Sequence, residues 1–194
     1  MAAGYVADMS DQRSDTTQAN LREALKRVAV ALKQTGVPFA LMGGYAVWAR
    51  GGPEPDHDVD FLIAEEDAAK VADLLADKGL QVEMPPEDWL FKVHTDGSVV
   101  DIIFRDSGHA AQRSVVEDAD ELEVLSVNMP VLSATELLIQ KMCAMGEHYC
   151  DFAVMLPVAR SLREQVDWSR VARETADNDF AAALLFLLDR LDIT

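Results

Sequence analysis

The residues LMGGY at 41–45 and DVDFLI at 58–63 decide the fold that we predict for this chain. The apolar segment Val37–Met42 has the composition of a buried strand. The pair Gly43-Gly44 allows the backbone to turn tightly and to approach a ligand before a short helix over Tyr45–Arg50. A second strand is expected over Asp58–Ile63. The sequence therefore predicts a strand, a glycine turn, a helix and another strand in close succession.

Two aspartates share one face of the second predicted strand. Because side chains alternate along a strand, Asp58 and Asp60 are expected to point the same way. Neighbouring carboxylates repel each other unless a cation lies between them, and such oxygen ligands suit Mg²⁺, or Mn²⁺, carried with the phosphates of a substrate. The pattern predicts a divalent metal site beside the glycine turn. The alternative is a turn followed by two solvated surface aspartates.

This order of elements resembles the nucleotidyltransferase superfamily related to DNA polymerase beta. The resemblance implies an α/β protein with a mixed sheet flanked by helices, followed by a C-terminal helical region. It also implies an enzyme that moves a nucleoside monophosphate from an NTP to an acceptor hydroxyl and releases pyrophosphate. We divide the chain into a polar tail at 1–14, a nucleotidyltransferase core at 15–132 and a helical region at 133–194.

The composition is that of an ordinary globular protein with an unusual charge. The 194 residues are 49% hydrophobic, and the formal net charge is -17. Neither a membrane-spanning apolar run nor a signal peptide is recognised, so a cytoplasmic location is expected. The two cysteines, Cys143 and Cys150, lack the spacing of a disulfide scaffold or a zinc site. The acidic charge requires that an anionic substrate bind at a locally positive or metal-filled site.

Hydrophobic periodicity and turn residues place the other elements. Leu21, Leu25, Val28 and Leu32 form one apolar stripe on a helix expected over Thr17–Gln34. The pair Asp96-Gly97 predicts a two-residue hairpin turn. Further predicted elements are a helix at 67–78, strands at 80–84, 90–95, 98–105, 121–127 and 129–132, and helices at 133–146, 168–176 and 180–191.

Counting outward from the hairpin turn places Lys92 opposite Asp101, inside an apolar strand where an unpaired charge would be costly. One interpretation is a cross-strand ion pair between the two side chains. The other follows from the resemblance, because the superfamily carries a third carboxylate on a following strand of the same sheet. On that basis Asp101 joins Asp58 and Asp60 as a catalytic residue and metal ligand.

A lysine lies within the apolar face of the next predicted helix. The capping box Ser133–Glu136 opens this helix, and Lys141 lies among Leu137, Leu138, Met142 and Met145 on its wheel. A cation in such a place needs an anionic partner, which makes Lys141 a candidate for a functional role. The alternative is a lysine with a buried stem and a solvated ammonium group.

The sequence from Leu132 to Ala144, together with Asp151, is similar to AbiE-type nucleotidyltransferase toxins. That resemblance assigns Lys141 to nucleotide phosphates and Asp151 to the nucleotide-binding rim, while Gly43 and Gly44 would offer N–H groups to the phosphates. This sequence departs from the pattern of those toxins at two positions: Gly44, where many members have serine, and Cys150, where they often have arginine. Asp151 has a second interpretation as the N-cap of the helix that it opens.

The Gly-Gly form, with His57 before the aspartates, is also similar to aminoglycoside and lincosamide nucleotidyltransferases. His57 either orients the site or is an exposed loop residue. The resemblance to the toxins predicts that the acceptor is RNA, a tRNA end, in a toxin–antitoxin system with a cognate antitoxin protein. The resemblance to the antibiotic-modifying enzymes gives the alternative, an antibiotic acceptor. A non-catalytic nucleotide-binding or antitoxin-like module is the alternative of another class. An RNA footprint would use Arg22, Lys26, Lys33, Arg160, Arg163, Arg170 and Arg173.

Overall fold

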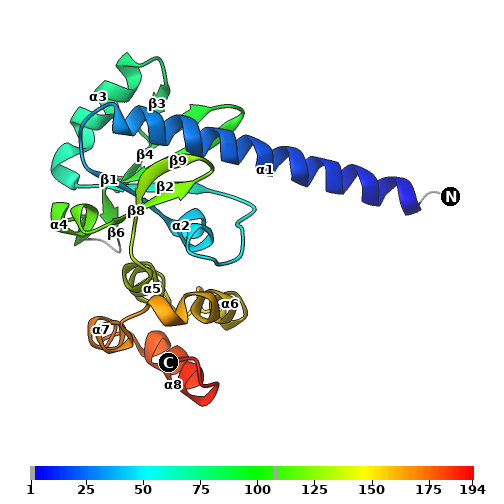
Figure 1. Cartoon of the computed structure of the whole chain (residues 1–194), viewed down its shortest axis with the longest axis vertical. Helices are drawn as coiled ribbons and strands as arrows, with labels where there is room; N and C mark the ends of the chain where they lie inside the picture. The colour runs from blue at the N-terminus through cyan, green and yellow to red at the C-terminus, as the bar shows by residue number, and fades with distance from the viewer. Residues whose placement is uncertain (1–2, 107–108) are drawn as a thin grey trace.

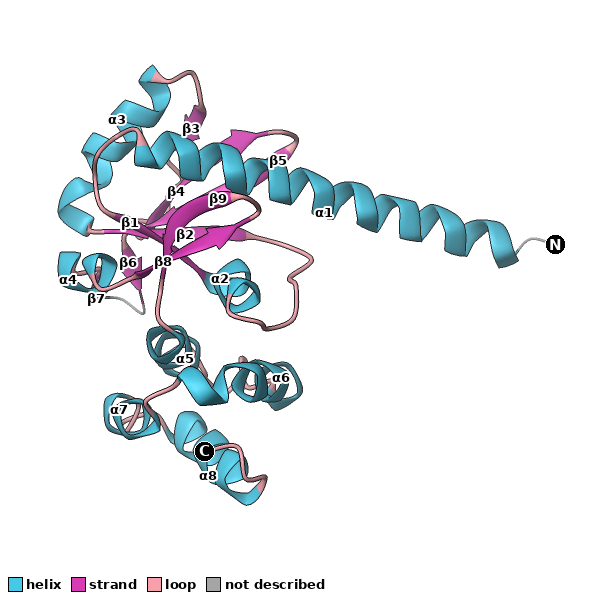
Figure 2. Ribbon diagram, viewed as in Figure 1, coloured by secondary structure: helices cyan, strands magenta, loops and turns pink. Residues whose placement is uncertain are grey.

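The computed structural model describes residues 3–106 and 109–194, and its centre is a mixed sheet of seven strands. The strand order is β3-β4-β5-β2-β1-β9-β8, which agrees with the predicted α/β class (Figure 2). The strands span Phe39–Met42 (β1), Val59–Ile63 (β2), Gln81–Glu83 (β3), Leu90–Thr95 (β4), Ser98–Ile103 (β5), Asp120–Val124 (β8) and Val127–Val131 (β9). A separate short pair joins β6 (Arg105–Asp106) to β7 (His109–Ala110).

The middle of the sheet brings together three chain segments that carry predicted site residues. Strand β2 runs antiparallel to β1, with Met42 opposite Asp60, and parallel to β5, with Asp60 beside Asp101. The end of β1, the start of β2 and the middle of β5 therefore meet. The glycine turn follows β1 directly, because α2 begins at Gly43 and ends at Ala49.

The hairpin between β4 and β5 has the predicted register. Its pairs run from Thr95 opposite Ser98 to Lys92 opposite Asp101, as the Asp96-Gly97 turn indicates. The predicted pair near the end of the core is also present, with β8 antiparallel to β9. Strand β5 ends at Ile103, two residues earlier than expected, since Arg105 already pairs with Ala110 in the separate small sheet.

Helix α1 (Ala3–Lys33) crosses the sheet and extends well beyond it at its N-terminal end (Figure 1). All four residues of the predicted apolar stripe are buried. The helix begins at Ala3 and not near Thr17, so most of the segment predicted as a polar tail is helical. No proline interrupts residues 3–33, and an established helix adds further turns at little cost.

The remaining helices cover the sheet and form a separate layer. Helices α3 (Ala68–Asp77) and α4 (Arg113–Glu117) accompany the sheet, whereas α5 to α8 gather on the side where α2 lies (Figure 1). These last helices span Ala134–Cys143 (α5), Phe152–Leu162 (α6), Trp168–Glu174 (α7) and Asp179–Arg190 (α8). The change from strands to helices thus falls between Val131 and Ala134. None of the helices within 3–106 and 109–194 is both long and apolar enough to cross a membrane.

Candidate active site

The glycine turn is packed against a carboxylate. Gly43 has a φ of +67°, and a Cβ added there would lie 2.0 Å from Oδ2 of Asp60. Side chains disfavour this backbone region, and no heavy atom tolerates such a distance, so only glycine suits position 43. A Cβ on Gly44 would lie 2.8 Å from the Pro55 ring. The two glycines therefore let β2 and the loop at 50–58 approach the start of α2.

Asp60 is the most perturbed acid of the site. Burial first, and then the negative charges of Asp101 and Asp58, raise its pKa to about 7, while Lys141 and His57 oppose the shift. Within the described ranges no hydrogen bond or ion-pair contact reaches its carboxylate. An acid that is partly removed from water and lies beside like charges favours a proton or a cation.

Asp58 lies next to β2 and not within it. Its φ is +49°, and the strand begins one residue later at Val59. Strand alternation therefore does not set the direction of its side chain, contrary to the prediction. Asp58 is exposed, and its charge still raises the pKa of Asp60. The structure thus brings the two aspartates together by a loop conformation that the period-two pattern does not contain.

Asp101 accepts two contacts from a lysine of the neighbouring strand. Lys92 Nζ lies 3.0 Å from Oδ1 and 3.4 Å from Oδ2 of Asp101, so the cross-strand ion pair is formed. This hydrogen bond to Asp101 is the main reason that the pKa of Lys92 is raised. Asp101 also lies beside Asp60 in the sheet. The interpretation as a cross-strand ion pair is therefore confirmed, while the role of Asp101 as a metal ligand stays a prediction. We refer to Asp58, Asp60 and Asp101 as the carboxylate cluster.

Lys141 reaches the site from the helical layer. It lies on α5, and burial lowers its pKa while the charge of Asp60 opposes that effect. No hydrogen bond or salt bridge to its ammonium group is present among the described residues. A cation that is partly removed from water without a contacting anion is poised to bind an anionic ligand.

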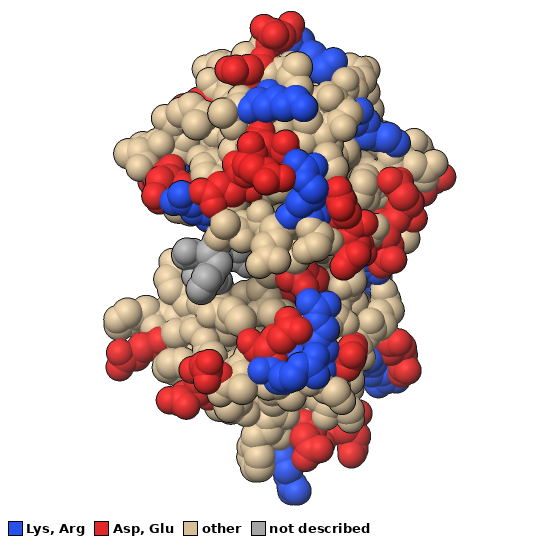
Figure 3. Space-filling model, turned by 90° about the vertical axis from the view of Figure 1, so that its left-hand side faces the viewer, with Lys and Arg blue, Asp and Glu red and all other residues tan. Residues whose placement is uncertain are grey.

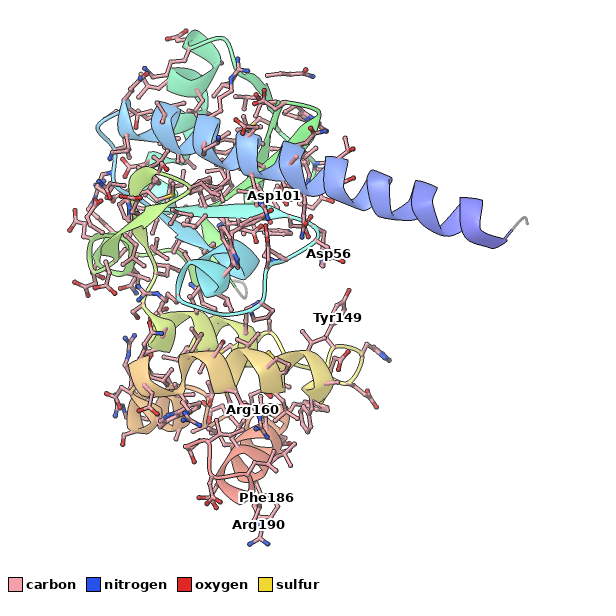
Figure 4. The ribbon with its side chains drawn as sticks, turned by 45° about the vertical axis from the view of Figure 1, so that its right-hand side comes forward. Asp56, Asp101, Tyr149, Arg160, Phe186 and Arg190 are labelled. Atoms are coloured by element: carbon pink, nitrogen blue, oxygen red, sulfur yellow. The ribbon has the colours of Figure 1, made fainter. Side chains whose placement is uncertain are left out.

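A cleft of about 410 Å³ separates the two layers at this point. Asp60 and Lys141 both line it, and α6 contributes Val154 and Val158. Figure 4 shows Asp101 on the sheet and Asp56 on the loop at 50–58, with Tyr149 on the helical side of the opening. The complete lining is Gly43, Gly44, Val47, Pro53, Glu54, Pro55, Asp56, His57, Asp58, Asp60, Lys141, Val154 and Val158.

The loop at 50–58 is fastened to α1. Arg22 donates from Nε to Oε1 of Glu54 at 2.7 Å and from its terminal nitrogen to Oε2 at 2.6 Å. The Arg22 guanidinium also lies 5.9 Å from the centre of the Trp48 ring. Sequence reasoning missed this clamp. The available signal was a glutamate inside a Gly- and Pro-rich loop, but its partner is distant in the sequence.

Two further predicted residues lie at the edge of the site. His57 contacts the carboxylate of Asp56, which lowers the pKa of that acid, and both side chains are exposed. Asp151 accepts from the backbone N–H groups of Ala153 at 2.9 Å and Val154 at 3.2 Å. Asp151 is therefore the N-cap of α6, and it is not among the residues that line the cleft.

The donor groups fit a magnesium ion that arrives with a nucleotide. Among the described residues, no three His, Cys, Asp or Glu side chains are arranged as a ready-made metal cage. Magnesium in NTP-dependent sites is usually held by one or two carboxylates together with substrate phosphates, so a complete cage is not required. The raised pKa of Asp60 marks the point where the carboxylates meet as a place that favours a cation.

Known proteins share this architecture. The chain aligns with the crystal structure of ANT(2")-Ia in complex with adenylyl-2"-tobramycin at a TM-score of 0.60 and 14% identity, covering 84% of this chain and 98% of that one. It aligns with the lincomycin-bound lincosamide antibiotic adenylyltransferase LnuA at a TM-score of 0.51 and 16% identity, covering 74% of this chain and 97% of that one. These likenesses show a shared fold. A search of the curated proteins finds no match.

Nearly the whole chain also matches one protein-family model. The match runs from residue 4 to residue 194, and its description is uncharacterised nucleotidyltransferase. The chain is therefore a member of this nucleotidyltransferase family.

Proposed function

We propose that the cleft between the sheet and α5 transfers a nucleoside monophosphate from an NTP to an acceptor hydroxyl, with release of pyrophosphate. The observation that carries the proposal is the pairing of a half-buried acid with a half-buried lysine. Asp60 and Lys141 line one cleft and shift each other's pKa values. Among the described residues neither side chain has a contact that would explain its burial structurally, and a metal–triphosphate complex would supply both missing charges.

Each residue of the site has a role in this scheme. Asp58 and Asp60 would hold Mg²⁺ or Mn²⁺ against the triphosphate, and Asp101 would complete the carboxylate cluster. The ion would polarise the transferred phosphoryl group. Gly43 and Gly44 leave the backbone of the turn open to phosphate oxygens, and Lys141 would bind the leaving pyrophosphate. Asp151 would act indirectly, by fixing the start of the helix that carries Val154 and Val158.

The charges near the cleft favour a small cationic acceptor over RNA. Four carboxylates and one lysine of the described residues line the cleft, and one of those carboxylates, on Glu54, is bound to Arg22. An acidic cleft attracts a cationic hydroxylated compound of the aminoglycoside type and repels the phosphodiester backbone of an RNA acceptor. The antibiotic-type acceptor, which the sequence offers as the alternative, is therefore the better supported one.

The basic residues predicted to form an RNA footprint are largely engaged within the protein. Arg22, Lys26, Arg163, Arg170 and Arg173 contact carboxylates, and Lys33 donates to the carbonyl of Asn128. On the face that Figure 3 presents, Lys and Arg side chains lie beside Asp and Glu side chains. Nucleic-acid binding depends on uncompensated cations. A tRNA acceptor and an antitoxin partner remain predictions of the sequence resemblance alone, and a cytoplasmic location likewise stays a prediction.

The acceptor is identified by label transfer. The protein is incubated with each α-labelled NTP, Mg²⁺ and either an aminoglycoside and lincosamide panel or total tRNA. We expect label on a cationic small molecule and none with Asp60→Asn. Labelled RNA that decreases steeply with salt would overturn the acceptor assignment but not the reaction. No label on any acceptor would favour the non-catalytic nucleotide-binding module.

A further inference from the structure

The ion pair between Lys92 and Asp101 places a resident cation inside the carboxylate cluster. The ammonium of Lys92 contacts both oxygens of Asp101, and Asp101 lies beside Asp60 in the parallel pairing of β2 and β5. The charge of Asp58 also acts on Lys92. Lys92 thus interacts with two of the three aspartates that were predicted to hold the metal.

The ion pair between Lys92 and Asp101 is partly exposed to solvent. The exposed fraction is 33% for the Lys92 side chain and 21% for that of Asp101. A lysine in this setting keeps its charge and can swing its ammonium group toward solvent without breaking the sheet. The long flexible stem therefore allows the contact with Asp101 to be exchanged.

A divalent ion that approaches alone must compete with this ammonium group. The ammonium group already compensates the charge of Asp101, so a metal ion that takes Asp101 as a ligand is repelled by that ammonium group unless Lys92 moves away. The released cation would then have no anion to bind. If the metal ion arrives with a triphosphate, however, the phosphate oxygens offer the released ammonium a new partner.

We propose that Lys92 is a positioning residue that couples metal binding to nucleotide binding: it holds Asp101 in the free protein and moves to the nucleotide phosphates when the metal–nucleotide complex binds. The proposal rests on the proposed function of the same cleft. It gives the neighbouring carboxylates of Asp60 and Asp101 a compensating cation in the sheet, and it gives Lys92 a second partner when the nucleotide is bound. Coupling of this kind typically amounts to roughly 5- to 150-fold in affinity.

Calorimetric titration of Mn²⁺ tests the coupling, with and without a non-hydrolysable NTP. In the unmodified protein the nucleotide should strengthen Mn²⁺ binding at least about tenfold. In Lys92→Met, Mn²⁺ alone should bind about tenfold more tightly, and the nucleotide should add less. Lys92→Gln, which keeps a hydrogen-bond donor near Asp101 without the charge, should behave like Lys92→Met. The matched control is Lys26→Met, which removes an exposed ion pair with Glu23 on α1.

The outcomes separate this proposal from the proposed function. Equal Mn²⁺ affinities in the unmodified protein and in both Lys92 variants, with an unchanged effect of the nucleotide, would overturn the role of Lys92 and leave the transfer site intact. An unmodified protein that binds neither Mn²⁺ nor nucleotide would overturn both. A lower melting temperature of the Lys92 variants without tighter Mn²⁺ binding would show a role in sheet stability alone, and it would also overturn the coupling.

Discussion

Asp60 illustrates what the identity of one residue can and cannot predict. Its place in the sequence DVD indicated a metal-binding carboxylate. Its burial and its raised pKa come from the contact with Gly43 and from its neighbour Asp101 on β5. These are tertiary effects. Likewise, the left-handed backbone of Asp58 is a property of the loop end, which the period of a strand cannot reveal.

The raised pKa makes stability depend on pH. The pKa of Asp60 is about 7 in the folded protein, against 3.8 for an unperturbed aspartate, so the folded state retains a proton that the unfolded chain loses. The free energy of unfolding should therefore decrease as the pH rises from about 4 to about 7. In Asp60→Asn this dependence should be weaker, and the variant should be the more stable protein at about pH 8. Urea unfolding in chelator-treated buffer measures the free energy of unfolding of the two proteins at each pH. Identical pH slopes for the two proteins would contradict the raised pKa of Asp60.

Gly36 and Gly43 share a left-handed backbone conformation but differ in what surrounds them. Comparing alanine variants at the two positions therefore separates the cost of backbone strain from the cost of a steric clash. Gly36 has a φ of +69° and free space around it, whereas Gly43 has a φ of +67° and faces Asp60. Gly36→Ala should cost about 1 kcal/mol of unfolding free energy, from the left-handed conformation alone. Gly43→Ala should cost clearly more, since its Cβ must displace the Asp60 carboxylate. Thermal melting of both variants checks this, and equal losses would show that the turn is not packed as described.

At the scale of elements, local sequence signals predicted turns and helix caps correctly, whereas contacts between residues distant in the sequence were missed. The Asp96-Gly97 turn predicted the register of the β4–β5 hairpin. Ser133 caps α5 as expected, accepting from the backbone N–H of Glu136 at 3.1 Å. The N-terminal extent of α1 and the clamp between Arg22 and Glu54 were missed. Neither has a strong local signature in the sequence.

The start of helix α6 allows a test of whether Asp151 acts as an N-cap or as a contact to the nucleotide. Asp151→Ala should destabilise the protein by about 1 kcal/mol, because two backbone N–H groups lose their acceptor. Asp151→Ser, which can still cap the helix, should restore most of the stability and the affinity for a non-hydrolysable NTP. Melting curves and nucleotide titrations serve as readouts. If the serine variant is stable but binds nucleotide as weakly as the alanine variant, Asp151 is a nucleotide ligand after all.

At the scale of the whole molecule, the site exists only because two layers meet. Lys141 belongs to the helical layer and Asp60 to the sheet, and they share a cleft although about 80 residues separate them in the chain. The sequence identified each residue by an anomaly: an aspartate pair beside a glycine turn, and a lysine in an apolar helix face. Their position on one cleft depends on how α5 packs against α2. No local pattern predicts that packing.

The most direct test of the central claim is the pair of measurements that Lys141→Met allows. A methionine of similar length suits the apolar face of α5, and it removes a charge that burial disfavours, so the melting temperature should be unchanged or higher. Calorimetric affinity for a non-hydrolysable NTP with Mg²⁺ should nevertheless fall by roughly 10- to 100-fold, for the loss of a charge-assisted contact to phosphate. A variant that melts at a lower temperature and binds the nucleotide as tightly as the unmodified protein would contradict the account.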